Sequence, residues 1–313
     1  MEITSGLIEF QNRVYLDRIS RLVRDLSSTS IDSRLFVNQM VSLSKLLSSL
    51  HRKLDKPIPI IDKNAQDPVY FIAAYFDTTN IGDAILVYRI VRSLTRFILL
   101  SDRFYETGNE KYALLAKQVR KSLNEFLKSG SNVQHLIYPM DYWLTQFSAF
   151  WEFERTMKHR IINNSTFSYN EISHFILSKS SDASLVYSKV LDAMLPTFNQ
   201  NVAMILHYNQ ALLDIQDDWE DIENDIRGDM PNIFVMAAVN YVPYHKIKDS
   251  SPEMIRKVVL SRINSSGGPI SKLVREIHDL SKDVPVPNRF GFLKSLSSRY
   301  AETLRQTIHT TNL

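Results

Sequence analysis

The sequence predicts an all-α protein, and three kinds of observation lead to that prediction. Long segments carry apolar residues three and four positions apart, the spacing that places side chains on one face of a helix. The 8 glycines and 11 prolines of the chain gather between these segments, where they end one helix and begin the next. Alternating apolar and polar residues around Asn-Gly or Asp-Gly turns, the pattern of β-hairpins, are missing.

The helices of the N-terminal half are delimited by serines, prolines and glycines. A serine-rich loop separates the first two helices, and prolines at 57 and 59 follow the second. Pro68 begins the third helix, Gly130 follows the fourth, and Pro139 precedes the fifth, which is rich in aromatic residues. The predicted ranges are 7–26, 35–54, 68–100, 111–127 and 139–157.

The C-terminal half is divided in the same way. A serine-rich break separates its first two helices, Pro231 begins the helix after the longest one, and Pro252 and Pro269 each begin a shorter helix. The predicted ranges are 169–177, 184–195, 199–227, a helix from 231, 252–263, 269–280 and 290–308. No internal repeat is visible, so we predict a single helical domain over residues 1–313.

Composition excludes several classes of function. A net charge of +3 is too small to indicate a nucleic-acid partner, and the absence of cysteine excludes disulfides and thiolate zinc sites. The first ten residues lack the pattern of a signal peptide. No apolar run reaches the roughly 18–20 residues of a membrane span. We therefore predict a cytoplasmic protein with no integral membrane segment.

The most informative segment is an acidic run inside the helix 199–227. Asp217, Asp221 and Asp225 recur every four residues, with Asp214 and Asp218 on a flanking ridge. On a helix such residues share a face about 6 Å apart, and their like charges weaken it. Mg²⁺ would offset the repulsion, because it takes carboxylate oxygens and shares them with substrate phosphates. A solvated acidic stripe is the alternative interpretation.

The order of residues in this run resembles a known motif. The second metal-binding motif of class I isoprenoid synthases has the same pattern as Asp217-Asp218-x-x-Asp221-x-x-x-Asp225. Bacterial terpene synthases often follow it with a segment similar to Gly228-Asp229-x-x-Asn232. Squalene and phytoene synthases and trans-prenyltransferases carry related patterns, so the branch stays open. The resemblance implies a helical bundle around a central apolar cavity, with three Mg²⁺ ions. The metal ligands that it implies in this run are Asp217, Asp218, Asp221 and Asp225.

The first metal-binding motif of that superfamily is predicted at residues 76–83. The segment Phe-Asp-Thr-Thr-Asn-Ile-Gly-Asp offers Asp77 and Asp83 as metal ligands, in place of the usual Asp-Asp-x-x-Asp. Six residues apart, the two acids point about 120° away from each other on a regular helix. Gly82 permits a local distortion of the helix that would bring both acids into one metal site. A surface acid and a helix cap are the alternative interpretation.

The resemblance also implies contacts to the diphosphate and to the prenyl chain. Arg299-Tyr300 resembles the Arg-Tyr pair near the C-terminus of many terpene synthases, and Lys179-Ser180 resembles the Lys-Thr of trans-prenyltransferases. Aromatic faces stabilise carbocations through the ring quadrupole. The aromatic residues that would line the cavity are Phe71, Tyr75, Phe76, Phe147 and Trp151; core packing is the alternative for each.

These residues together predict a Mg²⁺-dependent terpene synthase that ionises an allylic prenyl diphosphate. The implied catalytic residues are Asp77, Asp217, Asp221, Arg299 and Tyr300. Chain-elongating prenyltransferases carry a Gly-Gly-Lys-Arg segment that this chain lacks, which favours a cyclase. A trans-prenyltransferase, a head-to-head synthase and a non-catalytic regulatory subunit are the alternatives. A di-iron bundle would need two Glu-x-x-His motifs, and the chain has one, at Glu171. Prenyl chain length, product and homodimer formation stay open.

Overall fold

A computed structural model of the chain describes residues 42, 81–130, 133–180, 189–194, 199–263 and 268–310. Within these residues every regular element is a helix and no strand occurs, which confirms the all-α prediction. None of the helices described is long and apolar enough to cross a membrane. The chain divides into two compact units, the first made of 1–145, 185–200 and 287–292, and the second of 146–184, 201–286 and 293–313.

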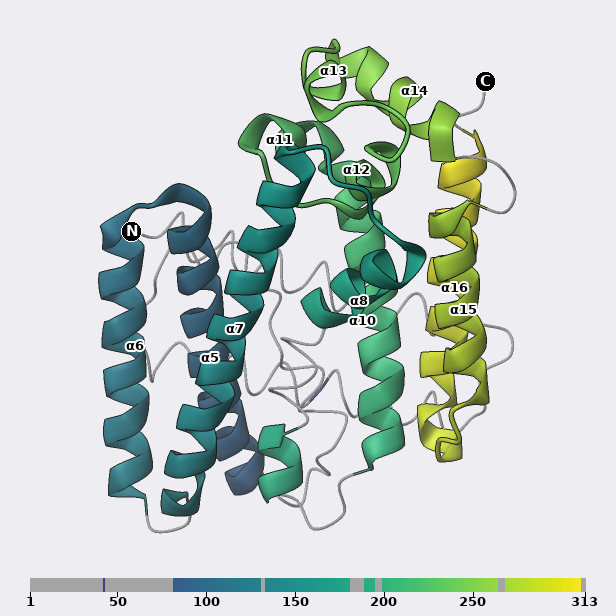
Figure 1. The fold of residues 1–313 in the computed structure, drawn as a ribbon. Coiled ribbons are helices and arrows are strands. Elements are labelled where there is room, and N and C mark those ends of the chain that lie inside the picture. The colour runs from purple at the N-terminus through teal and green to yellow at the C-terminus, as the bar shows by residue number, and fades with distance from the viewer. Residues whose placement is uncertain are drawn as a thin grey trace. The chain divides into compact units, whose positions relative to one another are not determined.

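The first unit contains a pair of long helices, α5 (Ile81–Thr107) and α6 (Glu110–Ser129), which lie side by side in Figure 1. Gly108 makes the turn between them with a positive φ of 66°, a conformation that glycine adopts without a steric penalty. Asn109 caps α6 by accepting a hydrogen bond from the backbone N–H of Lys111. The guanidinium of Arg89 lies 4.0 Å from the ring centroid of Phe126 and so joins the two helices.

The second unit is built around the short helix α12 (Ile233–Ala238), in which every residue is buried. It packs against α8 (Tyr169–Lys179), α14 (Pro252–Ile263) and α15 (Pro269–Asp283). The other helices described are α7 (Ile137–Ile162), α10 (Gln200–Glu220), α11 (Ile222–Gly228), α13 (Tyr244–Lys248) and α16 (Gly291–Thr310). Two short 3₁₀ turns, Gln134–Leu136 and Asn288–Phe290, precede α7 and α16.

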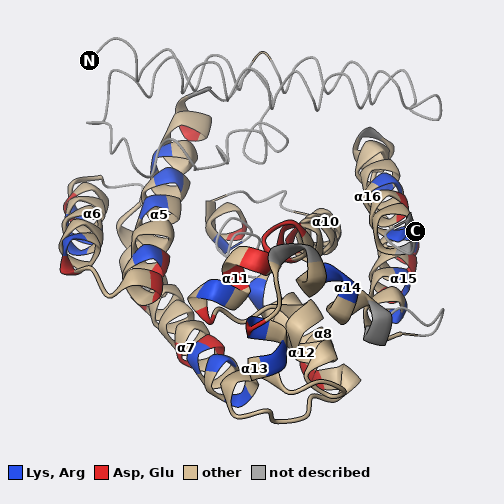
Figure 2. Cartoon of the chain, turned by 90° about the horizontal axis from the view of Figure 1, so that it is seen from above, with Lys and Arg blue, Asp and Glu red and all other residues tan. Residues whose placement is uncertain are grey.

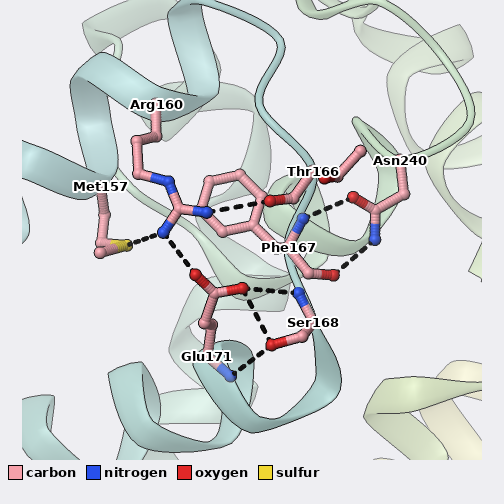
Figure 3. A network of polar contacts seen from close by, with 7 residues as sticks. All are labelled: Met157, Arg160, Thr166, Phe167, Ser168, Glu171 and Asn240. Carbon is pink, nitrogen blue, oxygen red and sulfur yellow. Dashed lines mark hydrogen bonds and ion pairs between the residues drawn. The ribbon is translucent and has the colours of Figure 1, made fainter.

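A network of polar contacts fixes the turn between α7 and α8 (Figure 3). Arg160 donates to Glu171 at 2.6 Å and lies over the ring of Phe167 at 4.5 Å. Asn240 pairs with Phe167 at both backbone groups, each at 2.8 Å. Ser168 and Glu171 form a capping box at the start of α8. These contacts therefore fix the start of α8. Because α8 is a single short helix, they also help to position its last residue, Lys179, which contacts Asp218 of the acidic run.

Most predicted helices in the described ranges are confirmed, with shifts of a few residues at their ends. Helix α7 begins two residues before Pro139, which its first turn tolerates because the N–H that proline lacks has no intrahelical partner there. The single helix predicted at 199–227 is divided at Asp221 into α10 and α11, and α13 was not predicted. The predicted helices 7–26 and 35–54 and the start of 68–100 lie outside the described residues, apart from residue 42.

A buried histidine joins α15 to α16. His278 is 6% exposed, and its Nδ1 lies 3.2 Å from Nη2 of Arg305. Because a guanidinium only donates, Nδ1 accepts, and Nε2 carries the proton that is donated to Oγ of Ser298 at 3.1 Å. Burial, followed by the charges of Lys282 and Arg305, lowers the pKa of His278 below its usual value, although Asp279 and Glu302 act in the opposite direction. The neutral form of His278 is therefore the form that joins α15 to α16.

Acid should therefore weaken the packing of α15 on α16. The lowered pKa in the folded state means that the unfolded chain takes up a proton more readily below about pH 6.5. The contribution of His278 to stability is complete above that pH and is lost as the pH falls toward the folded pKa. Urea unfolding between pH 7.5 and 5.5 should show a steeper loss for the wild type than for His278→Gln. Equal slopes for the two proteins would contradict the lowered pKa of His278 in the folded protein.

Candidate functional site

The acidic run lies across the junction of α10 and α11, where Figure 2 shows acidic residues gathered. Asp221 stands between the two helices. Its backbone N–H donates to the carbonyl of Asp217 at 2.8 Å, and its carbonyl accepts from the N–H of Asp225 at 2.9 Å. These bonds keep the four-residue register of the three acids across the junction, as the sequence predicts.

Arg256 of α14 holds this junction in place. Its Nη2 donates to the backbone carbonyl of Glu220 at 2.9 Å, and its Nε donates to the carboxylate of Glu223 at 3.1 Å. Its guanidinium also lies 4.9 Å from the ring centroid of Trp219, a buried residue that packs on Phe234. The last carbonyls of a helix lack intrahelical partners. The bond from Arg256 supplies one, and it therefore stabilises the break between α10 and α11.

The acids of the flanking ridge are committed to contacts inside the protein. The side chain of Asp218 is 1% exposed; its Oδ1 accepts from Nζ of Lys179 at 2.6 Å and its Oδ2 accepts from the N–H of Ile233 at 2.9 Å. Asp214 is 8% exposed and accepts from Nε2 of Gln210 at 2.7 Å. Asp218 therefore serves the packing of α10 against α8 and α12, whereas Asp214 is bonded to Gln210 within α10 and to Ser180 at the end of α8. We call Asp214 and Asp218 the inner acids.

Asp217, Asp221 and Asp225, which we call the outer acids, are less committed. Asp217 and Asp221 are exposed and Asp225 is half-buried. The carboxylate of Asp217 accepts no hydrogen bond from any residue that the structure describes. Asp221 accepts one long bond from Asn224, at 3.4 Å, and Asp225 accepts at Oδ2 from Asn232, at 2.8 Å. The outer acids therefore keep oxygen atoms that a cation could take.

The electrostatics of this region reflect crowded carboxylates. Desolvation, followed by the charge of Asp214, raises the pKa of Asp217 to about 6, even though the side chain keeps an exposed surface. Desolvation also raises the pKa of Asp225 to about 7; the bond from Asn232 opposes the rise, and the charges of Asp218 and Asp221 add to it. Burial and neighbouring carboxylates therefore both disfavour the charged forms of Asp217 and Asp225, and the charge of Lys179 acts against that effect.

Lys179, at the last position of α8, supplies positive charge to the inner acids. Desolvation alone would lower its pKa, but the charges of Asp218 and Asp214 outweigh it, so the net pKa of Lys179 is raised. Its charge acts in turn to lower the pKa values of Asp214, Asp217 and Asp225. Lys179 was predicted as a diphosphate ligand, and the structure places it in an ion pair with an inner acid.

Asn232 connects the acidic junction to the core helix. It is fully buried, and its Oδ1 accepts from the N–H groups of Phe234 and Val235, which caps α12. Its Nδ2 donates to the backbone carbonyl of Asp218 at 2.5 Å and to Oδ2 of Asp225 at 2.8 Å. One side chain thus fixes an outer acid and the start of α12 together.

Asp229, the other polar residue of that segment, has a different role. It ends α11 in the left-handed conformation, with φ 54°. Its Oδ1 accepts from the hydroxyl of Tyr244 at 2.8 Å and from Nζ of Lys248 at 2.5 Å. Burial would raise its pKa, but these bonds outweigh burial and leave the pKa lowered. Asp229 therefore anchors α13 to the end of α11.

Of the other predicted site residues, some lie in the described part of the chain and some lie outside it. Asp83 is exposed in the first turn of α5, where the helix dipole favours an acid. Phe147 and Trp151 of α7 are buried, with ring centroids 6.4 Å apart. The residues that lie outside the described part of the chain are Asp77, Phe71, Tyr75 and Phe76. Asp83 belongs to the first unit and the acidic junction to the second, so a site shared by both motifs stays a prediction.

The Arg-Tyr pair lies on α16 in the second unit. Arg299 is exposed, and Tyr300 packs against the core of that unit. Arg305, five residues past Tyr300 on the same helix, is engaged by His278. Their contact with a diphosphate stays a prediction.

The outer acids fit a hard divalent cation in their chemistry. They are carboxylate oxygen donors with few hydrogen bonds inside the protein, and Mg²⁺ prefers such oxygens and completes its coordination with water and phosphate. Within the described ranges, however, no three His, Cys, Asp or Glu side chains stand ready to hold a metal ion. A bound cation would therefore need these side chains to move or a substrate to supply ligands.

Sequence reasoning missed Gln210 and Arg256, which build this site, and placed Asn232 only in the segment that follows the acidic motif. The contact between Gln210 and Asp214 follows the i,i+4 rule and could have been found. Asn232 both caps α12 and bonds to Asp225, and neighbouring residues in the sequence do not indicate this double role. They do not indicate the contacts of Arg256 with the junction either. Arg256 reaches partners 33 and 36 residues away, which only the packing of α14 brings close.

Comparison with known proteins gives no match. The chain matches no protein-family model, no curated protein and no solved structure. The resemblance to class I isoprenoid synthases therefore rests on the motif residues, and the geometry around them carries the functional argument.

Proposed function

We propose that the protein is a Mg²⁺-dependent class I terpene synthase, which ionises an allylic prenyl diphosphate to give cyclised or rearranged products. One observation carries the proposal: the acidic run is divided into inner acids bonded within the protein and outer acids that keep oxygen atoms for a cation. A merely solvated stripe would not need a lysine and two buried carboxylates behind it. Most charged residues are fully buried only when they are paired, and here the pairing positions the helix that bears the outer acids.

Each residue has a stated role in this proposal. The outer acids would hold Mg²⁺, which supplies Lewis-acid stabilisation of the diphosphate leaving group when the allylic C–O bond breaks. Arg299 and Tyr300 would bind the diphosphate oxygens, and the buried aromatic residues of α7 would exclude water from the cation. No side chain of the protein acts as a covalent nucleophile.

The test is the release of pyrophosphate from geranyl, farnesyl and geranylgeranyl diphosphates by the full chain, with Mg²⁺ and without isopentenyl diphosphate. We expect release from at least one substrate, hydrocarbon or alcohol products by mass spectrometry, and no release in EDTA. Release that needs isopentenyl diphosphate and gives only longer prenyl diphosphates would replace the cyclase by a prenyltransferase. A product joined from two prenyl chains would indicate a head-to-head synthase.

One observation favours a second candidate, a non-catalytic regulatory subunit of such an enzyme. In the part of the chain that the structure describes, no three metal-binding side chains are assembled. A subunit that keeps the fold without the chemistry would show the same feature. The absence of any product from all three diphosphates, for a folded protein, would favour this candidate. Cytoplasmic localisation stays a prediction under either candidate.

A further inference from the structure

Lys179 makes the one ion pair that the described residues provide to the inner and outer acids. Its Nζ lies 2.6 Å from Oδ1 of Asp218, and the two side chains are 31% and 1% exposed. Because the lysine is only partly exposed and the aspartate is buried, solvent screens this pair weakly. The positive charge also acts on Asp214, Asp217 and Asp225, the acids on either side of Asp218.

Both carboxylate oxygens of Asp218, the partner of Lys179, are engaged inside the protein. One oxygen accepts from the lysine and the other from the N–H of Ile233 at the start of α12. Removing either bond would leave a buried polar group without a partner, which is costly. The residue next to it, Asp217, is exposed and has no such contacts within the described ranges. Two adjacent aspartates of the motif thus have different surroundings.

We propose that Lys179 is the internal counter-ion of the outer acids and sets their affinity for divalent cations, while Asp218 is a positioning residue that holds the lysine and does not bind metal. This inference rests on the proposed function, because it assumes that the outer acids take a cation. The lysine and the metal compete for the same negative charge, so the ion pair weakens metal binding in the resting protein. Removing the lysine charge should therefore tighten the binding of a divalent cation.

The experiment is a double-mutant cycle on cation affinity, with Mn²⁺ as the probe and free Mn²⁺ measured by electron paramagnetic resonance at low ionic strength. The four proteins are the wild type, Lys179→Met, Asp218→Asn and the double variant, all as the full chain. We expect Lys179→Met to bind Mn²⁺ roughly tenfold more tightly and Asp218→Asn roughly tenfold more weakly, the effect of one unit charge nearby. The double variant restores the net charge and should bind within about threefold of the wild type.

The outcomes are distinct. If Asp218 were a metal ligand, the double variant would bind Mn²⁺ far more weakly than the wild type, and the proposal would be wrong. Equal affinities of Lys179→Met and the wild type would also overturn it, while leaving the proposed metal site standing. If none of the four proteins binds Mn²⁺ at millimolar concentration, the proposed function itself loses its metal site, and the inference is rejected with it.

A second variant guards against loss of the fold. Lys179→Met leaves the Asp218 carboxylate buried without its charged partner, which destabilises a protein strongly. Lys179→Gln removes the same charge but keeps an N–H donor for that carboxylate, so it should fold and show the same gain in Mn²⁺ affinity. Circular dichroism of each variant establishes that the helices are intact. A folded Lys179→Gln with wild-type affinity would contradict the counter-ion role.

Discussion

Replacing Asp217 or Asp221 by alanine should abolish Mg²⁺-dependent turnover of the prenyl diphosphate while leaving the helical content unchanged. Both acids are exposed and neither is needed for packing. Loss of an outer acid removes a proposed metal ligand, so we expect kcat/KM to fall at least ~1000-fold, about 4 kcal/mol of transition-state stabilisation. Relief of the like-charge repulsion along the helix should leave stability equal or slightly higher. Pyrophosphate release and far-ultraviolet circular dichroism measure the two effects.

Glu220→Ala is the matched control for this prediction. Glu220 lies in the same segment, is exposed, and carries the same charge, but its carboxylate accepts from Gln216 on another face of α10. Its removal should change kcat/KM by no more than a few-fold. A comparable loss in Glu220→Ala would mean that overall charge, and not ligation, explains the result. Near wild-type activity of Asp217→Ala would show that the ligand assignment is mistaken.

The helices were predictable from sequence because their ends carry local signals. Pro252 and Pro269 stand at the first positions of α14 and α15, as the sequence predicts. The break at Asp221 was not predictable in the same way. The local pattern there is that of one continuous helix, and the contact that stabilises the break comes from Arg256, which lies far along the chain. A tertiary contact overrides local propensity in such a case.

The candidate site was predictable in its register but not in its division into inner and outer acids. Asp217 and Asp218 are adjacent and chemically identical, yet Asp217 is exposed and Asp218 is 1% exposed. What separates them is the packing of α8 and α12 on one side of α10. The pairing of Lys179 with Asp218 depends on that packing too, whereas the resemblance to trans-prenyltransferases implied a diphosphate partner for the lysine.

Asn232→Ala should produce the largest loss of stability among the substitutions at the junction. The alanine removes the cap of α12, leaves the carbonyl of Asp218 without its partner, and releases Oδ2 of Asp225. A lost cap costs about 1 kcal/mol and each buried group left without its partner about 1–3 kcal/mol, so we expect the free energy of unfolding to fall by roughly 3 kcal/mol. Urea unfolding at pH 8 measures it. Asn224→Ala, which removes only an exposed amide and a 3.4 Å contact, is the control and should cost under ~0.5 kcal/mol.

Asn232→Asp separates the two roles of this side chain. It keeps an oxygen that can cap α12, but at pH 8 it replaces the Nδ2 donor by a carboxylate next to Asp225. Burial and the neighbouring charge would raise the pKa of the new carboxyl in the folded state, so the variant should regain stability as the pH falls from 8 toward 5. A protonated carboxyl can then donate to Asp225 as the amide did. A variant as stable as the wild type at both pH values would show that the link to Asp225 contributes little and that the cap of α12, which the aspartate keeps, is what the protein needs.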